Sequence, residues 1–291
     1  MKILQRNLTL LLVAASISAY LMALISGVRT EWAVLGSSVA AITTVWWLER
    51  RIPFREDWSR NRGDLGTDIA SAGVLVGVVD PLVKALAPAL VVWVYGAVAV
   101  PPVTSSLPPW AQALLVLLIV EFGKYWSHRA HHALAPLWWL HAMHHGSERL
   151  YFLNGLRFHP LNHVLNFAAS VLPAMLLGFS AEAIWAYLAF TQPIVLMQHS
   201  NIDLRQGWVN VVLSTPEAHR WHHSTSPDEA NRNYGSALLL WDHVFGTYKA
   251  AGGFAAGKQV GLFSASESAY PRRSSYVAQL LSMCRPACCR A

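Results

Sequence analysis

The sequence predicts an all-α, integral-membrane helical bundle with a histidine-rich helical cap on its cytoplasmic side. Two observations support this prediction. Hydrophobic residues make up 54% of the 291 residues and charged residues only 13%, which excludes most soluble classes. All thirteen histidines lie between His128 and His243, so the first 127 residues contain none. An even distribution would have placed several there, and chance is therefore a poor explanation.

The first two apolar segments, residues 8–25 and 32–48, are predicted membrane helices. A cleaved signal peptide is the alternative for the first, but its cleavage-site pattern is poor and a second span follows closely. The loop at residues 49–64 contains five arginines: Arg50, Arg51, Arg55, Arg60 and Arg62. Because short cytoplasmic loops are enriched in Lys and Arg, this loop and the N-terminus are predicted to be cytoplasmic.

Residues 67–100 are apolar apart from Asp80-Pro81, Lys84 and Pro88. They form either one tilted span with an interfacial portion or a kinked or re-entrant pair, and the sequence leaves both open. A proline-rich connector, 101–109, precedes a span at 110–126. The segments 164–177 and 181–197 read as a hairpin that enters and leaves on the same side. If 67–100 crosses once, all the histidines emerge on the cytoplasmic face.

Three regions follow from this pattern: an N-terminal transmembrane region (1–109), a catalytic domain (110–249) and a poorly ordered tail (250–291). The tail holds the three cysteines, Cys284, Cys288 and Cys289, away from any histidine, so a disulfide framework is not expected. The net charge of +6 is placed mainly in short loops beside apolar segments. Membrane orientation explains it better than nucleic-acid binding, because basic stripes with interleaved aromatics are missing.

The histidines occur in three motifs with helical spacing. The first is H-x-x-x-H, and two copies of H-x-x-H-H follow. Residues three and four apart share one face of a helix, so the rings of a motif can point at one centre. The motifs comprise His128, His132, His141, His144, His145, His219, His222 and His223.

Eight imidazoles exceed the four ligands of one tetrahedral zinc, so the motifs predict two metal ions. Imidazole binds iron, zinc, copper and nickel, and affinity alone does not choose among them. Solvated or core histidines are the structural alternative, but burying so many unpaired polar rings is costly. Two further alternatives are a membrane protein that binds or transports zinc or copper and a b-type cytochrome. The histidines lie outside the predicted spans, which argues against both transport and haem ligation.

The three histidine motifs, in this order and separated by a hydrophobic hairpin, resemble those of the fatty acid hydroxylase/sterol desaturase superfamily. Smaller elements agree with it between about residues 110 and 249. They are Arg157-Phe-His159-Pro160, Gln198-His199-Ser200-Asn201, Asn233-Tyr234-Gly235, Trp241-Asp242 and Phe245-Gly246-Thr247-Tyr248.

The resemblance implies a non-haem di-iron oxygenase of the membrane that hydroxylates or desaturates a lipid of the sterol, fatty acyl or alkylglycerol type. Zinc is expected to substitute for iron in vitro. The eight motif histidines match ligand positions, His199 matches a further one, and His159 matches the H-P element, which ranks lower. His131 is expected to lie outside the ligand set and His243 to be structural, while the role of His163 stays open. The lack of a long soluble domain favours a bacterial inner-membrane protein, and the endoplasmic reticulum is the alternative location.

Other polar residues near the motifs are candidates for orienting the ligands. They are Glu121, Lys124, Glu148, Glu217 and Asp242; for Glu121 and Lys124 mutual pairing is an equally good explanation. A fused cytochrome b5 domain would show H-P-G-G, whereas His159-Pro160 is followed by Leu-Asn. A G-x-G-x-x-G nucleotide motif is missing too. Electrons are therefore expected from a separate ferredoxin, cytochrome b5 or reductase.

Overall fold

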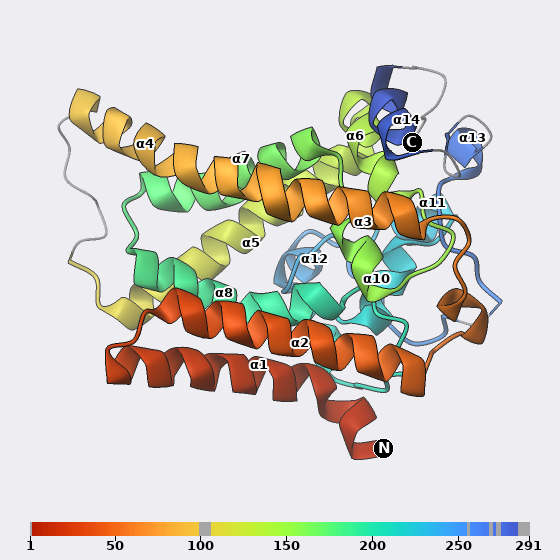
Figure 1. Ribbon diagram of the computed structural model, residues 1–291, viewed down its shortest axis with the longest axis horizontal. Coiled ribbons are helices and arrows are strands. Elements are labelled where there is room, and N and C mark those ends of the chain that lie inside the picture. The colour runs from red at the N-terminus through yellow and green to blue at the C-terminus, as the bar shows by residue number, and fades with distance from the viewer. Residues whose placement is uncertain (1, 99–105, 255–256, 268–269, 272–274, 285–291) are drawn as a thin grey trace.

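A computed structural model describes residues 2–98, 106–254, 257–267, 270–271 and 275–284. Over these residues the secondary structure is helical, with isolated β-bridges such as Leu213–Leu238 and no strands. Most of the predicted 101–109 connector, together with Cys288 and Cys289, lies outside the described residues. Figure 1 shows long helices running side by side, with short helices gathered at one end of the bundle.

The long helices correspond to the predicted apolar segments. α1 (Lys2–Ser26) and α2 (Thr30–Arg51) contain the first two, and α7 (Pro160–Leu176) and α8 (Ala181–Met197) contain the two arms of the predicted hairpin. Among the described residues, two helical stretches are long and apolar enough to cross a membrane by length and composition, Lys2–Ser26 and Leu65–Ala97. Ala181–Met197 is a shorter apolar helix.

The stretch that the sequence left open is continuous. α3 (Leu65–Val74) passes through a π-helical turn, η2 (Leu75–Val79), into α4 (Asp80–Val98) without a break. Asp80 pairs with Lys84 one turn later at 2.5 Å, which satisfies two charges within the apolar run. About thirty residues at 1.5 Å each exceed a 30 Å hydrocarbon core, so a helix of this length that crossed a membrane would tilt or protrude at one end.

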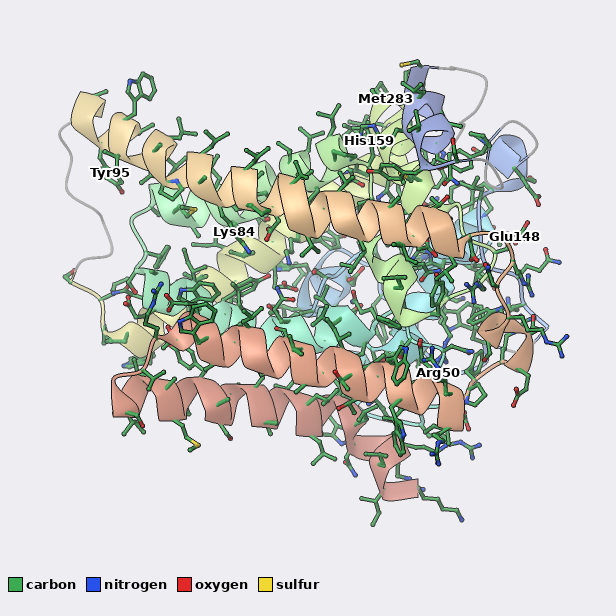
Figure 2. The ribbon with its side chains drawn as sticks, in the orientation of Figure 1. Arg50, Lys84, Tyr95, Glu148, His159 and Met283 are labelled. Atoms are coloured by element: carbon green, nitrogen blue, oxygen red, sulfur yellow. The ribbon has the colours of Figure 1, made fainter. Side chains whose placement is uncertain are left out.

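The arginine-rich loop lies toward the same end of the bundle as the histidines. Figure 2 shows Arg50, Glu148 and His159 toward one end, Lys84 in between, and Tyr95 near the other. α5 (Pro109–Ala133) lies against α7 and α8, and it approaches α7 closely at Gly123. A Cβ on Gly123 would lie 2.1 Å from the carbonyl oxygen of Ala169, so only glycine allows this contact.

Short helices build the cap, and most of them lie toward the histidine end of the bundle. They are η1 (Glu56–Ser59), α6 (Ala135–His145), η3 (Phe152–Leu156), α9 (Val209–Val212), α10 (Pro216–His222), α11 (Pro227–Ala230), α12 (Leu240–Val244), α13 (Ser264–Glu267), α14 (Tyr276–Leu280) and η4 (Leu281–Cys284).

Two buried ion pairs connect the start of the α3–α4 helix to the cap. Arg149 binds Asp64 through two hydrogen bonds of 2.8 and 2.9 Å, and Arg157 binds Asp68 with both side chains fully buried. Since desolvation offsets much of the attraction of a buried pair, we attribute to them alignment of helix and cap more than net stability.

The C-terminal part differs from the poorly ordered tail that the sequence predicts. Leu262, Phe263 and Tyr270 are buried, and the ring of Phe263 stacks on Trp138 at 4.8 Å. These few large apolar side chains within a small, polar stretch bury enough surface to hold the described part against α6.

Candidate metal centre

Five histidines form a first cluster. Their candidate ligand nitrogens all lie within 4.8 Å of one another. Two come from the end of α5, two from α6 and one from α10: His128, His132, His141, His145 and His222. The first predicted motif and parts of the other two thus meet at one point.

Four histidines form a second cluster with the same spread of at most 4.8 Å. They are His144 of α6, His199 just after α8, and His219 and His223 at α10. Together the clusters contain nine of the ten sequence-predicted ligands, and the structure does not bring His159 to either. The Nδ1 of His159 instead accepts from the amide of Leu161 at 3.1 Å and begins α7.

Each H-x-x-H-H motif contributes to both clusters. In α6 the i,i+4 pair His141 and His145 belongs to the first cluster, and His144 belongs to the second. At α10 the assignment is reversed: the pair His219 and His223 joins the second cluster, and His222 the first. Because residues i+3 and i+4 leave a helix about 100° apart, one helical turn can serve two neighbouring centres. The rings of His145 and His223 stack at 4.4 Å between them.

Hydrogen bonds orient most of these rings. In six of the nine rings, Nδ1 lies within 3.2 Å of a carbonyl oxygen, either of the backbone or of an asparagine side chain. The pairs are His128 with Tyr234 O, His132 with Asn231, His141 with Asn162, His144 with Arg157 O, His199 with Asn154 and His222 with Arg232 O. A ring that donates through Nδ1 keeps the lone pair on Nε2 free, and second-sphere contacts of this kind are typical of metal-ligating histidines.

The nitrogens that face inward fit a metal ion better than a hydrogen-bonded core. Nε2 of His219 lies 3.1 Å from Nε2 of His199 and 3.2 Å from that of His223. In the first cluster, Nε2 of His128 and His141 are 3.1 Å apart, while Nε2 of His132 and His222 and both nitrogens of His145 are buried without a partner. Buried polar atoms are rarely left unpaired, so converging lone pairs indicate cation sites.

Burial also keeps the rings neutral. Desolvation lowers the pKa of all nine histidines, to about 4 for His128 and about 3 for His199. Because a metal ion binds the neutral form of imidazole, these rings do not have to lose a proton near pH 7 in order to bind one. All candidate ligands are uncharged, which is the donor set suited to iron, zinc or copper rather than magnesium or calcium.

The carboxylates suggested by the sequence have other partners. Glu121 accepts from the backbone amides of Ala237 and Leu238 and from the Tyr187 hydroxyl. Asp242 accepts from the amides of Tyr234 and Gly235, and Glu217 from that of Gln206. The side chain of Lys124 reaches Ser236 at 3.3 Å. These groups stabilise loops of the cap rather than touching a cluster ring.

Sequence reasoning missed the amides that orient ligands: Asn154, Asn162 and Asn231. Each asparagine lies far in the sequence from the histidine that it contacts, so no spacing pattern predicts the pair. Asn162 also links His141 to His131, whose Nε2 is 3.0 Å from the amide nitrogen. His131 therefore lies behind the first cluster.

The remaining histidines lie apart from the clusters. His163 faces Asp80 at 3.7 Å, and His243 pairs with the carbonyl oxygen of Val211 at 2.9 Å and stacks on Tyr248.

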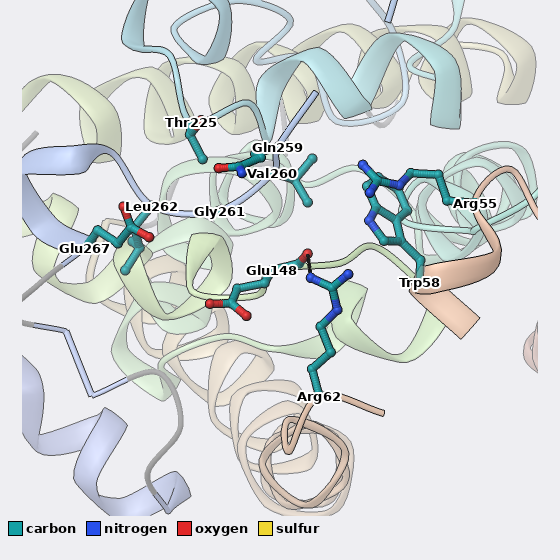
Figure 3. A pocket seen from close by; sticks show the side chains of 10 residues that line it. All are labelled: Arg55, Trp58, Arg62, Glu148, Thr225, Gln259, Val260, Gly261, Leu262 and Glu267. Atoms are coloured by element: carbon teal, nitrogen blue, oxygen red, sulfur yellow. Dashed lines mark hydrogen bonds between the residues drawn. The ribbon is translucent and has the colours of Figure 1, made fainter. Parts of the chain in front are cut away.

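A polar cavity of about 340 Å³ is lined by residues that include Arg62, Glu148 and Gly261 (Figure 3). Arg62 reaches across it to the backbone oxygen of Glu148, three residues after His145. Gly261 donates its amide to the carbonyl oxygen of His223. The cavity wall and the candidate ligands thus share backbone segments.

Fold and site together define a helical protein with two adjoining all-histidine clusters that could hold metal ions and two helical stretches that could cross a membrane. Residues 113–247 match the family described as fatty acid hydroxylase. The chain is 33% identical over 230 residues to the ornithine lipid hydroxylase OlsE of Rhizobium tropici, covering 76% of this chain and 69% of that protein. It belongs to the fatty acid hydroxylase/sterol desaturase superfamily and is an oxidoreductase.

More distant relatives include alkylglycerol monooxygenases. Identity is 32% over 156 residues with that of Danio rerio and 28% over 155 residues with that of Homo sapiens. These alignments cover about half of this chain but only 32% and 31% of the two relatives. No solved structure shows a significant match to the chain.

Proposed function

We propose that this protein is a multi-pass membrane monooxygenase that hydroxylates a lipid at a di-iron centre. The observation that carries the proposal is the sharing of each H-x-x-H-H motif between two all-histidine clusters. The first ion would be held by His128, His132, His141, His145 and His222, and the second by His144, His199, His219 and His223.

Bound iron would supply the redox chemistry, because the uncharged imidazole side chains of the site cannot supply it. The net reaction converts a C–H bond, dioxygen, two electrons and two protons into a C–OH group and water. The chain's own residues bind and orient the ions, and the buried cap excludes bulk water from them. The two electrons come from a separate donor of the ferredoxin, cytochrome b5 or reductase type.

The substrate class follows from the relatives. OlsE is named as a hydroxylase of ornithine lipid, and the other relatives as monooxygenases of alkylglycerol. We assign hydroxylation rather than desaturation, with an ornithine-type lipid as the first substrate to test. The arginine-rich loop, which begins at Arg50, lies at the histidine end of the bundle (Figure 2). This agrees with a bacterial inner-membrane protein whose clusters face the cytoplasm.

The proposal is tested by lipid mass spectrometry of a bacterial host that makes ornithine lipid, with and without the protein. Hydroxylation adds one oxygen atom, which carries the label when cells grow under ¹⁸O₂. A His145→Ala variant made in equal amount serves as the control and is expected to give no product. Unchanged lipids together with zinc alone in the purified protein would instead favour a metal-binding protein.

A further inference from the structure

The cap exposes a continuous apolar surface on α9 and α12 that the proposed chemistry does not use. We call it the apolar patch and define it by five side chains that are 41–67% exposed: Trp208, Val211, Val212, Leu240 and Val244. The exposed side chains of these two helices include no Asp, Glu, Lys or Arg. The exposed polar side chain on them is that of His243, and its Nε2 lies 2.9 Å from the carbonyl oxygen of Val211. A patch of this kind marks an interaction surface.

The patch continues onto the apolar side of α5. Phe122 and Trp126 are 42% and 41% exposed. The ring centroids of Phe122 and of Trp241 in α12 are 4.9 Å apart, and those of Trp126 and Phe245 are 5.0 Å apart. α12 is therefore joined through aromatic contacts to a helix whose apolar segment is a predicted membrane span.

Two neighbouring helices indicate how deep the patch lies. Val209, Leu213 and Ala237 pack against Val13 of α1, eleven residues after Lys2, which corresponds to about 16 Å along the helix. Glu121 of α5 binds the amides of Ala237 and Leu238. It lies twelve residues before the end of α5 at Ala133, which corresponds to about 18 Å along the helix. In Figure 1, α12 lies level with the middle of the long helices, whereas α11 lies toward the cap end.

The backbone beneath the patch is satisfied internally, as lipid requires of a segment that is not a complete helix. The amides of Tyr234 and Gly235 donate to Asp242, those of Ala237 and Leu238 to Glu121, and that of Leu239 to the carbonyl oxygen of Val212. A water-exposed turn would not need two buried carboxylates for this purpose.

Basic residues border the patch. Arg205 is exposed three residues before Trp208, Arg232 is exposed and binds the carbonyl oxygen of Gly246, and Arg129 lies over the ring of Trp126 at 5.3 Å. Apolar side chains rimmed by arginine suit the boundary between acyl chains and anionic headgroups.

We infer that α9 and α12 insert into the nearer leaflet of the bilayer as a membrane element that does not span. The occupant of the apolar patch is lipid, and the arginines at its border face phospholipid headgroups. This surface fixes the height of the clusters above the bilayer, and the inference holds whichever metal they bind.

The test uses the full chain in phosphatidylcholine vesicles with added phosphatidylglycerol. Cys284, Cys288 and Cys289 are replaced by serine, and a single cysteine labelled with an environment-sensitive fluorophore is placed at Val212 or Val244. Asp228→Cys, exposed on α11, is the matched control. Iodide reports access from water, and a nitroxide-labelled phospholipid reports contact with acyl chains.

Labels at Val212 and Val244 are expected to be quenched by the nitroxide lipid and at least about fivefold less by iodide than the label at Asp228. Equal iodide quenching at all three positions would overturn the inference. Protection of the patch labels from both quenchers would overturn it too, because protein would then cover the patch.

A second measurement needs no label and guards against variants that misfold. The fluorescence of Trp208, taken as the difference between the wild-type protein and a Trp208→Phe variant, should be quenched by brominated phospholipid. Emission that responds to iodide and not to brominated lipid would contradict membrane insertion.

Discussion

Asn154 orients His199: its side-chain oxygen lies 2.8 Å from Nδ1, and its amide nitrogen donates to Ser147 and to the backbone oxygen of Arg149. Asn154 is fully buried. The amide can therefore present only its oxygen to the imidazole, which leaves Nε2 as the free acceptor toward the second cluster. A residue of η3 thus sets the tautomer of a candidate ligand forty-five positions away.

Removing this amide should weaken the second metal site. For Asn154→Ala we expect metal affinity to fall about 10–100-fold, the usual effect of losing such a contact. Chelator competition on the purified protein measures it. Asn166→Ala is the control, because the oxygen of Asn166 accepts from Ser127 rather than from a cluster histidine. Equal affinities of the two variants would show that the Asn154 contact is incidental.

Single ligand changes should remove one ion at a time. His144→Ala is expected to lower metal content at the second cluster and His145→Ala at the first, each abolishing lipid hydroxylation, because each has lost a member of one cluster. Metal analysis per chain measures the loss. His243→Ala should keep its metal, since its ring binds the Val211 carbonyl. Comparable metal loss in His243→Ala would refute the assignment of ligands.

His159 separates the sequence expectation from the geometry. The resemblance assigns it to the ligands, whereas the structure makes it the N-cap of α7. His159→Ala should therefore retain the full metal content and lose about 1 kcal/mol of stability, as N-cap substitutions do. Thermal unfolding and metal analysis on one preparation distinguish the two roles, and a metal-depleted variant would return His159 to the ligand set.

Glu49 predicts a pH dependence of stability. It is 7% exposed at the end of α2, and burial raises its pKa to about 7, although hydrogen bonds from the amides of Asn201 and Phe152 oppose the rise. Between its unfolded pKa of about 4.3 and its folded value, only the folded chain holds the proton, so stability falls as pH rises through this window.

Glu49→Gln keeps the acceptor oxygen and removes the titration. We expect the wild-type melting temperature in detergent to fall by several degrees more than that of Glu49→Gln between about pH 5 and about pH 8. Parallel curves for the two proteins would mean that Glu49 does not bind a proton on folding.

Local patterns predict only part of this molecule. Apolar runs and the i,i+4 spacing of His128 and His132 are local properties, so the long helices and the motif histidines could be predicted from them. The division of α6 between two clusters could not, because it depends on how α6 packs against α10. The same holds for Asn154 and for Phe263, whose partners lie far away in the sequence.

The central claim is that two ions lie side by side in a single chain. Iron determination on detergent-purified protein from iron-supplemented cells, combined with Mössbauer spectroscopy of ⁵⁷Fe-loaded samples, tests it most directly. About two irons per chain with imidazole ligation are expected. A single iron per chain, or zinc alone in a preparation that leaves lipids unchanged, would contradict this.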